Sequence, residues 1–524
     1  MSGQLAKRPK PRGSGDSVQT SRWSREELQR SHERLQRDLD HVRERLAERE
    51  QQIVEAEQHI ADAEKKIADA EKKIADLERQ LALRQQNSTT SSKPPSSDGL
   101  AGGPRERGRR KKSRRKPGGQ PGHPGHCRPT VPPERVTHVI DVFPPTCRHC
   151  DQALSARGRV VTGVARRHQV TELPPIAAEI TEYRCLQVVC PACRQTTQAS
   201  LPEDVTGQFG PQLTALIAYL TVVCRIPRRL VRALLEDALH VPLSLGSTQA
   251  AWEEASAAVD APCAELEQAL RHQPVLNSDE TGHRTNGEKR WLWAVVASRF
   301  VVYRIAPTRA ANVLVALLGD VFAGVLCSDR WRPYQTYHQG ALQFCWAHFK
   351  RNLLGAQDLA KTTEAERFCR DALALHARLF RLWYRFRGDP AARGRPLTRA
   401  QLIDKVLPLQ RQFFALGQRH LDSPNRDVRN LAAALFAHHE KFFVFVHHDG
   451  VEPTNNRAER ALRAAVQWRK IMFGNRSADG ELAVARLLTV TRTCQMQQLN
   501  ALVYLTAAIR AHRRRQIVAS LLPA

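Results

Sequence analysis

The chain has 524 residues, of which 80 are Lys or Arg and 53 are Asp or Glu, so its formal net charge is +27 at pH 7. One hydrophobic core rarely grows beyond about 300 residues, so several domains are expected, and so large a charge indicates a polyanionic partner. No run of about 18 apolar residues occurs and the first residues are polar and basic, which argues against a spanning helix or a secretory signal and favours a cytoplasmic, nucleic-acid-binding protein over a membrane-surface one.

A seven-residue apolar repeat runs from about Leu28 to Leu81 and predicts a coiled coil through which two or more copies associate. One series is Leu39, Leu46, Ile53, Ile60, Ile67, Ile74 and Leu81, and the other is Leu28, Leu35, Val42, Arg49, Ala56, Ala63, Ala70 and Leu77. The alternative, a single solvated helix, would leave this stripe in water. We therefore expect a homo-oligomer, with a dimer as the simplest form.

Residues 87–98 are rich in Ser, Thr and Pro and cannot form one continuous helix or strand. A run of Arg and Lys follows at 105–116, and then a Gly- and Pro-rich stretch at 117–125. We interpret the run as an arm that becomes ordered on DNA phosphates, whereas the alternative is a solvated linker. Its candidate DNA-binding residues are Arg109, Arg110, Lys111, Lys112, Arg114, Arg115 and Lys116.

Two pairs of cysteines have the spacing of zinc ligands. They are Cys147-Arg-His-Cys150 and Cys190-Pro-Ala-Cys193, and a segment expected to be rich in strands separates them. In a reducing compartment such pairs favour a metal over disulfides, and four thiolates can close a structural Zn²⁺ site. The gap of about 40 residues is longer than is usual, and the alternative is that one pair is incidental.

Residues 212–259 have a helical pattern. Two segments, 226–235 and 242–252, resemble a helix–turn–helix, with Ser247 as the expected cap of the second helix. Ordinary helical packing explains the same pattern equally well, so both interpretations stay open.

Strand patterns begin after Pro274. Strands are predicted at 275–279, 291–298, 300–306, 324–329 and 342–345, with a helix at 308–320 and another from about Ala347. This order is typical of a ribonuclease-H-like α/β core. It places Asp279 on the first strand and Asp329 at the end of the fourth, where neighbouring strand ends bring two carboxylates together.

A helical stretch from Glu364 to Val446 is predicted to be an insertion, after which the core resumes at Val451. Pro453 and Thr454 are typical of a helix start. On the helix that follows, one face carries an acid among polar and basic groups, namely Asn456, Glu459, Arg460 and Arg463. We expect the acid to bind a cation and Asn456, Arg460, Arg463, Arg469 and Lys470 to bind DNA.

Asp279, Asp329 and Glu459 are therefore the candidate catalytic residues, and three carboxylates suit catalytic Mg²⁺ or Mn²⁺. Each has a structural alternative: Asp279 as a turn acid, Asp329 as a helix cap, and Glu459 as part of a capping box. Glu280 is expected on the opposite face of its strand and is left out. Cys345 and His348 fit either support of this site or packing at a strand-to-helix junction.

The chain resembles the transposases of the insertion-sequence-66 (IS66) family over nearly its whole length. The resemblance rests on segments 91–98 and 118–123, both cysteine pairs, Asp279-Glu-Thr-Gly282 with Trp291-Leu-Trp293, Ser328-Asp329, Cys345-Trp-Ala-His348, and the stretch from Asn455 to Gly480. It implies a bacterial Asp-Asp-Glu DNA transposase that cuts the inverted ends of its element and transfers strands to target DNA. It also implies possible accessory proteins.

The expected architecture is multidomain α+β. It comprises a basic tail (1–21), a coiled coil (22–86), a linker and basic arm (87–135), a zinc-ribbon-like domain (136–200), a helical DNA-binding region (201–270), the first part of the core (271–360), the helical insertion (361–450) and the end of the core with C-terminal helices (451–524). A non-catalytic DNA-binding regulator and a nuclease that only cuts are the competing hypotheses. A regulator would show neither metal-dependent cleavage nor strand transfer.

Overall fold

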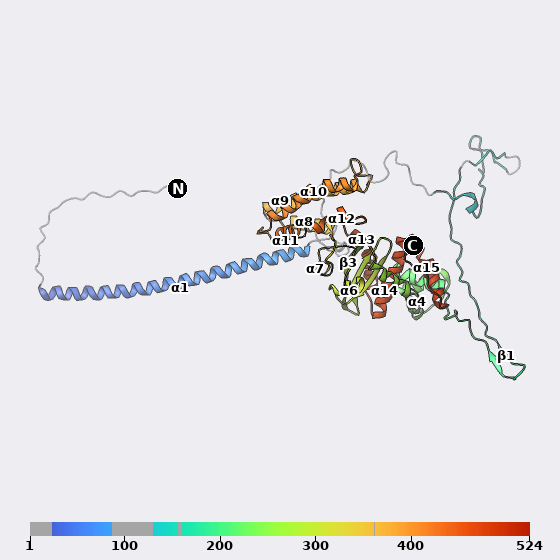
Figure 1. Ribbon diagram of the computed structural model, residues 1–524, viewed down its shortest axis with the longest axis horizontal. Coiled ribbons are helices and arrows are strands. Elements are labelled where there is room, and N and C mark those ends of the chain that lie inside the picture. The colour runs from blue at the N-terminus through green and yellow to red at the C-terminus, as the bar shows by residue number, and fades with distance from the viewer. Residues whose placement is uncertain (1–23, 86–128, 156–159, 165, 361, 524) are drawn as a thin grey trace. The chain divides into compact units, whose positions relative to one another are not determined.

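The computed structural model describes residues 24–85, 129–155, 160–164, 166–360 and 362–523, and it divides into two compact units at Gln86 (Figure 1). The first unit is the helix α1 (Arg25–Gln85), 61 residues long, which corresponds to about 90 Å. Ser24 and Glu27 exchange side-chain and backbone hydrogen bonds of 2.9 and 3.3 Å at its start, the pattern of a capping box. The arm at Arg109–Lys116 lies outside the described residues.

The segment that carries the cysteine pairs has little regular structure. Its described part contains a short 3-10 helix η2 (Pro133–Arg135) and two antiparallel strands, β1 (Gln187–Val189) and β2 (Thr196–Gln198). The strand-rich segment expected between the two pairs is therefore reduced, among the described residues, to the three residues of β1. Most side chains here are exposed, so no hydrophobic core imposes longer strands.

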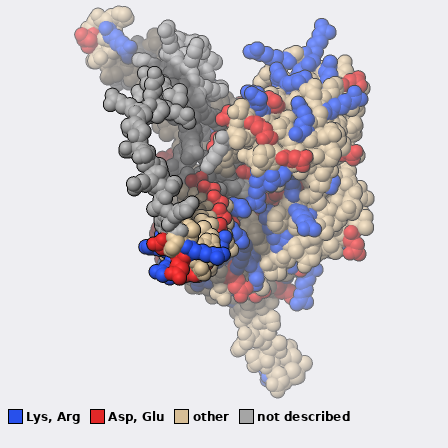
Figure 2. All heavy atoms as spheres, turned by 90° about the vertical axis from the view of Figure 1, so that its left-hand side faces the viewer, with Lys and Arg blue, Asp and Glu red and all other residues tan. Residues whose placement is uncertain are grey.

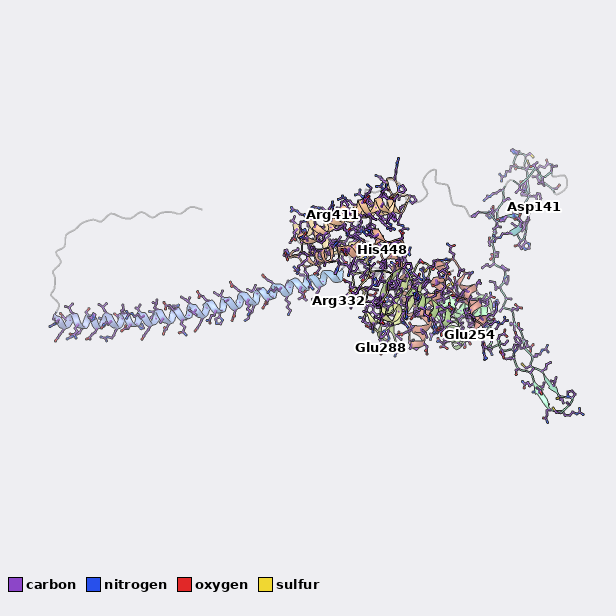
Figure 3. The ribbon with its side chains drawn as sticks, in the orientation of Figure 1. Asp141, Glu254, Glu288, Arg332, Arg411 and His448 are labelled. Atoms are coloured by element: carbon purple, nitrogen blue, oxygen red, sulfur yellow. The ribbon has the colours of Figure 1, made fainter. Side chains whose placement is uncertain are left out.

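Four helices precede the sheet: α2 (Pro211–Val222), α3 (Arg228–Leu239), α4 (Leu245–Ala258) and α5 (Asp260–Leu270). The cap of α4 is Ser244, which accepts the Ser247 N–H at 3.0 Å, so the expected cap Ser247 is wrong by three residues. α4, which carries Glu254 (Figure 3), packs against α2, α3, α14 (Ala478–Met496) and α15 (Ala501–Arg513). Arg513 of α15 donates two hydrogen bonds to Glu254. One face of α4 is buried in these contacts, and the other, with Gly246, Ala250, Glu253 and Ala257, is exposed. The helix–turn–helix interpretation therefore stays a prediction.

The core is a five-stranded sheet in the order β5-β4-β3-β6-β7. The strands are β3 (Val275–Thr285), β4 (Glu288–Val296), β5 (Val301–Ala306), β6 (Val325–Ser328) and β7 (Leu342–Phe344). β3, β4 and β5 are antiparallel, whereas β6 and β7 run parallel to β3. The hairpin at Asn286-Gly287 has positive φ at both residues, as tight hairpins of this sequence require, and it carries β3 six residues past its predicted end.

Short helices complete the crossovers, α6 (Asn312–Leu318) before β6 and α7 (Arg332–Tyr337) before β7. α13 (Asn456–Met472) packs on β3 and β4, and α14 packs along β5. Along β5, the Thr489 and Thr493 hydroxyls of α14 accept the backbone N–H groups of Tyr303 and Val301 at 3.0 and 3.2 Å. These bonds satisfy the outer edge of the sheet, which would otherwise be open to another chain.

Helices fill the segment between β7 and α13: α8 (Trp346–Asp358), α9 (Thr363–Phe386), α10 (Arg399–Arg419), α11 (Arg426–Ala437), η3 (His439–Phe442) and α12 (Val444–His447). Trp346 is fully buried among their aromatic rings and donates its indole N–H to the Phe442 carbonyl at 2.6 Å. The architecture is thus mixed α and β, with many helices around one mixed sheet. In the part of the chain that the structure describes, no helix is both long and apolar enough to cross a membrane.

Candidate functional site

Two of the predicted acids lie side by side at the centre of the sheet. β3 and β6 are parallel neighbours, with Asn277 opposite Cys327. Continuing this register by two residues brings Asp279 beside Asp329, on strands that are about 4.8 Å apart. Asp279 lies within β3, opposite Ala294, so it is not a turn acid. One Asp329 oxygen accepts the Trp331 N–H at 2.8 Å. The N-cap of α7 is Trp331, and its start has no side-chain capping bond, so Asp329 is not the helix cap.

Glu459 reaches the site because Asn455 fixes the start of α13. The Asn455 side chain is fully buried, accepts a hydrogen bond from Asn277 at 2.9 Å and donates one to the Ser278 carbonyl at 2.8 Å. Both partners belong to β3, so α13 starts against the strand that carries Asp279. Glu459 follows one helical turn later, and the start of α13 has no side-chain capping bond, which contradicts the capping-box alternative.

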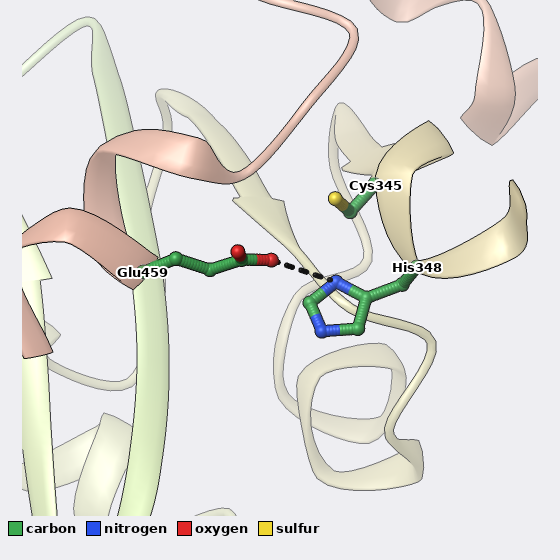
Figure 4. A group of neighbouring side chains, drawn as sticks. All are labelled: Cys345, His348 and Glu459. Carbon is green, nitrogen blue, oxygen red and sulfur yellow. Dashed lines mark ion pairs between the residues drawn. The ribbon is translucent and has the colours of Figure 1, made fainter. Parts of the chain in front are cut away.

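Cys345 and His348 lie next to Glu459 (Figure 4). His348 Nδ1 is 3.5 Å from Glu459 Oε1, the same oxygen that Arg351 Nη2 approaches to 2.9 Å. The ligand atoms of Cys345, His348 and Glu459 lie within 4.8 Å of one another, and this is the one such group of three among the described residues. The two residues therefore contact the candidate site and do not merely pack at a junction.

Burial determines the protonation states of Cys345 and His348. The buried Cys345 thiol has its pKa raised to about 12, and its sulfur accepts the Asn455 N–H at 3.1 Å. Burial, and next the charge of Arg351, lower the pKa of His348. A neutral thiol and a neutral imidazole thus flank the Glu459 carboxylate near neutral pH, and they leave Arg351 as its cationic partner.

The electrostatic environment of Asp279 is strongly negative. Burial raises its pKa well above the usual range, and the charges of Glu280, Asp329 and Glu459 raise it further. Its own backbone neighbour, the Glu280 N–H, donates a 3.0 Å hydrogen bond that opposes this shift only in part. Several carboxylates that repel one another in a partly buried place are typical of a site for divalent cations. The residues present therefore fit Mg²⁺ or Mn²⁺.

Glu280 is a residue of this region that the sequence prediction left out. Its side chain is completely buried on the other face of β3, where it contacts the Arg309 guanidinium and the Tyr334 hydroxyl. Arg309 also stacks over Trp331, with its guanidinium carbon 4.2 Å from the ring centroid. Because Trp331 binds Asp329, this network connects the two aspartate-bearing segments from behind. Its partners lie 29 and 54 residues from Glu280 in the chain, so no local pattern could indicate it.

Each cysteine pair forms a tight turn by itself. The Asp151 N–H donates to the Cys147 carbonyl at 2.9 Å, and the Arg194 N–H to that of Cys190 at 2.8 Å. Backbone N–H groups of the turns lower the pKa of both Cys147 and Cys190, which favours thiolate ligands. The structure does not gather three or more of the described Cys147, Cys150, Cys190 and Cys193 sulfurs within 4.8 Å of one another. The joint zinc site stays a prediction.

The expected DNA-binding residues of α13 differ in exposure. Arg460, Arg463 and Lys470 are exposed, Asn456 is half-buried, and Arg469 packs on β3, 3.4 Å from the Thr281 hydroxyl. Lys and Arg side chains spread over the face of the molecule in Figure 2, with Asp and Glu among them. This face therefore shows no single basic patch, and a DNA path over the core stays a prediction.

Comparisons with known proteins give the family. The model of the family described as "Transposase IS66 family" matches residues 206–482, which is 277 of the 524 residues. A second model, of a family of unknown function (DUF6444), matches residues 17–129. The uncharacterized protein y4qI of Sinorhizobium fredii (strain NBRC 101917 / NGR234) is 25% identical over 243 residues, 42% of this chain, and the chain spans only 43% of that protein. The first match includes the sheet, Asp279, Asp329 and Glu459, and by it the chain belongs to the IS66 family of transposases.

Proposed function

We propose that this protein is a DNA transposase that cuts the ends of its insertion sequence and joins them to target DNA, with Asp279, Asp329 and Glu459 as the catalytic metal-binding residues. The observation that carries the proposal is the β3–β6 register, which continues to put Asp279 beside Asp329. The buried Asn455 supports it, because its bonds to β3 lead α13 and Glu459 to the same place. The strand order β5-β4-β3-β6-β7 supports a ribonuclease-H-like core.

Mg²⁺ or Mn²⁺ bound to these acids would lower the pKa of a coordinated water and balance charge on phosphate oxygens. The chain supplies the frame for this chemistry. Asp279 and Asp329 are held by paired strands, and Arg351 holds the Glu459 carboxylate with a 2.9 Å hydrogen bond. Arg460 and Arg463, exposed on the Glu459 helix, suit DNA phosphates, as do Arg109–Lys116 in the arm.

Metal-dependent strand breakage tests the proposal. A supercoiled plasmid that carries both element ends is incubated with the protein and either Mg²⁺ or EDTA, and the breaks are mapped. We expect breaks at the element ends in Mg²⁺ only, followed by strands joined to new DNA sites. Breaks without joined products would favour a nuclease that only cuts. DNA binding without breaks, also after accessory proteins from the same element are added, would favour a regulator.

Zinc is proposed as a structural ion of Cys147, Cys150, Cys190 and Cys193. The turn at each pair and the lowered pKa of Cys147 and Cys190 support thiolate ligands. We expect the purified protein to contain about one Zn²⁺ per chain, and Cys190→Ser/Cys193→Ser to lose it, because two thiolates hold zinc poorly. Elemental analysis measures this. The matched control is Cys224→Ser, an exposed cysteine outside both pairs; equal zinc in all three proteins would remove this site.

A further inference from the structure

The apolar stripe of α1 is open to solvent in a single chain. Its large side chains at both heptad positions, from Leu28 to Leu81, are between 51% and 65% exposed. A helix of 61 residues with such a stripe is stable in water when a second helix covers it. The proposed self-association leaves open how the helices are oriented, and the charges beside the stripe decide this.

We propose that α1 pairs with α1 of a second copy of this chain as a two-stranded coiled coil that is parallel and in register. Ile53, Ile60, Ile67 and Ile74 occupy the first core position of the heptad, position a, where β-branched residues favour two strands. Ala56, Ala63 and Ala70 occupy position d of the same turns. This inference deepens the homo-oligomer that the heptad repeat predicts, and it is independent of the DNA chemistry.

The flanking positions have opposite charges over the C-terminal half of the helix. Position g, just before each a residue, carries Lys66 and Lys73, whereas position e carries Glu64, Glu71 and Glu78. A parallel pair places each g residue against the e residue five positions later in the partner, which gives Lys66 with Glu71 and Lys73 with Glu78.

A fully overlapping antiparallel pair places g against g and e against e. Lys73 then attracts Asp38 and Glu64 attracts Arg43, but Lys66 repels Arg45 and Glu57 repels Glu50, so that the contacts cancel. In the parallel pair every charged g–e contact attracts. Orientation is thus decided by charge.

The register is decided nearer the N-terminus, where the signs are reversed. Position g carries Asp38 and then Arg45, and position e carries Arg43 and then Glu50. In register, Asp38 faces Arg43 and Arg45 faces Glu50, and both pairs attract. A shift of one heptad places Asp38 against Glu50, or Arg45 against Arg43. Like charges opposite each other destabilise the shifted pair.

Arg49 is the polar residue of the repeat at position d, and it also favours the in-register pair over a shifted one. In register, the two Arg49 side chains share one layer, so one layer is poorly packed. Any shift places each Arg49 against an apolar residue and spoils two layers. A single polar core position is known to specify register at some loss of stability. Parallel pairing also brings both Gln85 ends together, so the segments that follow them in the two chains start from one place.

Two charge-reversed variants of the full chain test the orientation. They are Lys66→Glu/Lys73→Glu and Glu71→Lys/Glu78→Lys, and each turns four attractive contacts of the parallel dimer into repulsive ones. We expect each alone to weaken the dimer roughly 30-fold or more in sedimentation without DNA. A mixture of the two restores all four attractions, so a tagged copy of one should retain the untagged other.

The matched control is Lys65→Glu/Lys72→Glu, which makes the same charge change on the outer face of the helix and should leave the dimer unchanged. Circular dichroism checks that every variant keeps its helix. An antiparallel pair predicts little change in either core-flanking variant. In it Lys66 and Lys73 face Arg45 and Asp38, whose charges are opposite in sign, and Glu71 and Glu78 face the neutral Gln36 and Gln29, so unchanged association would overturn the parallel orientation. Neither DNA nor a metal ion is needed, so failure here is distinct from failure of the proposed transposase chemistry.

Discussion

Asp329→Asn protein should bind DNA that carries the element ends as tightly as the natural protein and should fail to cut it. The substitution keeps the shape of the side chain and its contact to the Trp331 N–H but removes the charge that a divalent cation needs. We expect end cleavage to fall by about a hundred- to a thousandfold, the effect of removing one group that stabilises transition-state charge. A gel-shift titration and a strand-cleavage time course measure the two properties separately.

Asp279→Asn should show the same loss of cleavage, and it should also raise the stability of the metal-free fold. The folded chain raises the pKa of Asp279, so keeping this group ionised lowers the stability of the metal-free fold once the pH exceeds its unfolded pKa. Removing the charge should raise the melting temperature of the metal-free protein near pH 8, by roughly 2–4 °C for each kcal/mol relieved, and less at acid pH. Mg²⁺ should stabilise the natural protein and not this variant. Cleavage that survives either substitution would remove that residue from the site.

Glu280→Ala should destabilise the core more than the loss of an ordinary surface acid. The substitution leaves Arg309 without its buried partner and removes a hydrogen bond of Tyr334. The loss should stay below the cost of breaking a fully buried pair, about 3–5 kcal/mol, because the Arg309 side chain is 28% exposed and water screens its remaining charge. Denaturant unfolding followed by tryptophan fluorescence measures the change, since Trp291 and Trp331 border Arg309.

Two comparisons separate the ion pair from simple loss of volume. Glu280→Gln keeps acceptors for Arg309 and Tyr334 and should recover part of the stability. Glu280→Leu/Arg309→Leu removes both charges and should be more stable than Glu280→Ala, because no buried charge is left alone. If all three variants unfold at the same denaturant concentration, the contact with Arg309 contributes nothing measurable to stability. The exposed Glu288 at the hairpin provides the surface control, Glu288→Ala, with little expected change.

Local patterns in the sequence were sufficient for the main strands and helices and for the family. Alternation and Gly or Pro boundaries predicted β5, β6 and β7 closely, because a strand between two layers requires such patterns. The motifs around Asp279, Asp329 and Glu459 predicted the IS66 family, and the family match confirms it. The heptad repeat indicated one long helix, since 3.5-residue periodicity is a local property, and the structure has α1 over that range.

Only the tertiary structure decided which side chains meet. Asn455, which lies next to the predicted Asn456, contacts β3 almost 180 residues away and so directs Glu459 to the aspartates. Glu280 binds Arg309 and Tyr334 for the same kind of reason: strand pairing and helix packing bring remote segments together, and no periodicity in the sequence encodes such a distance. The helix α4 shows the converse. Its sequence fits a DNA-reading helix as well as a packed one, and in the fold it has both a buried face and an exposed face, so its packing does not separate the two.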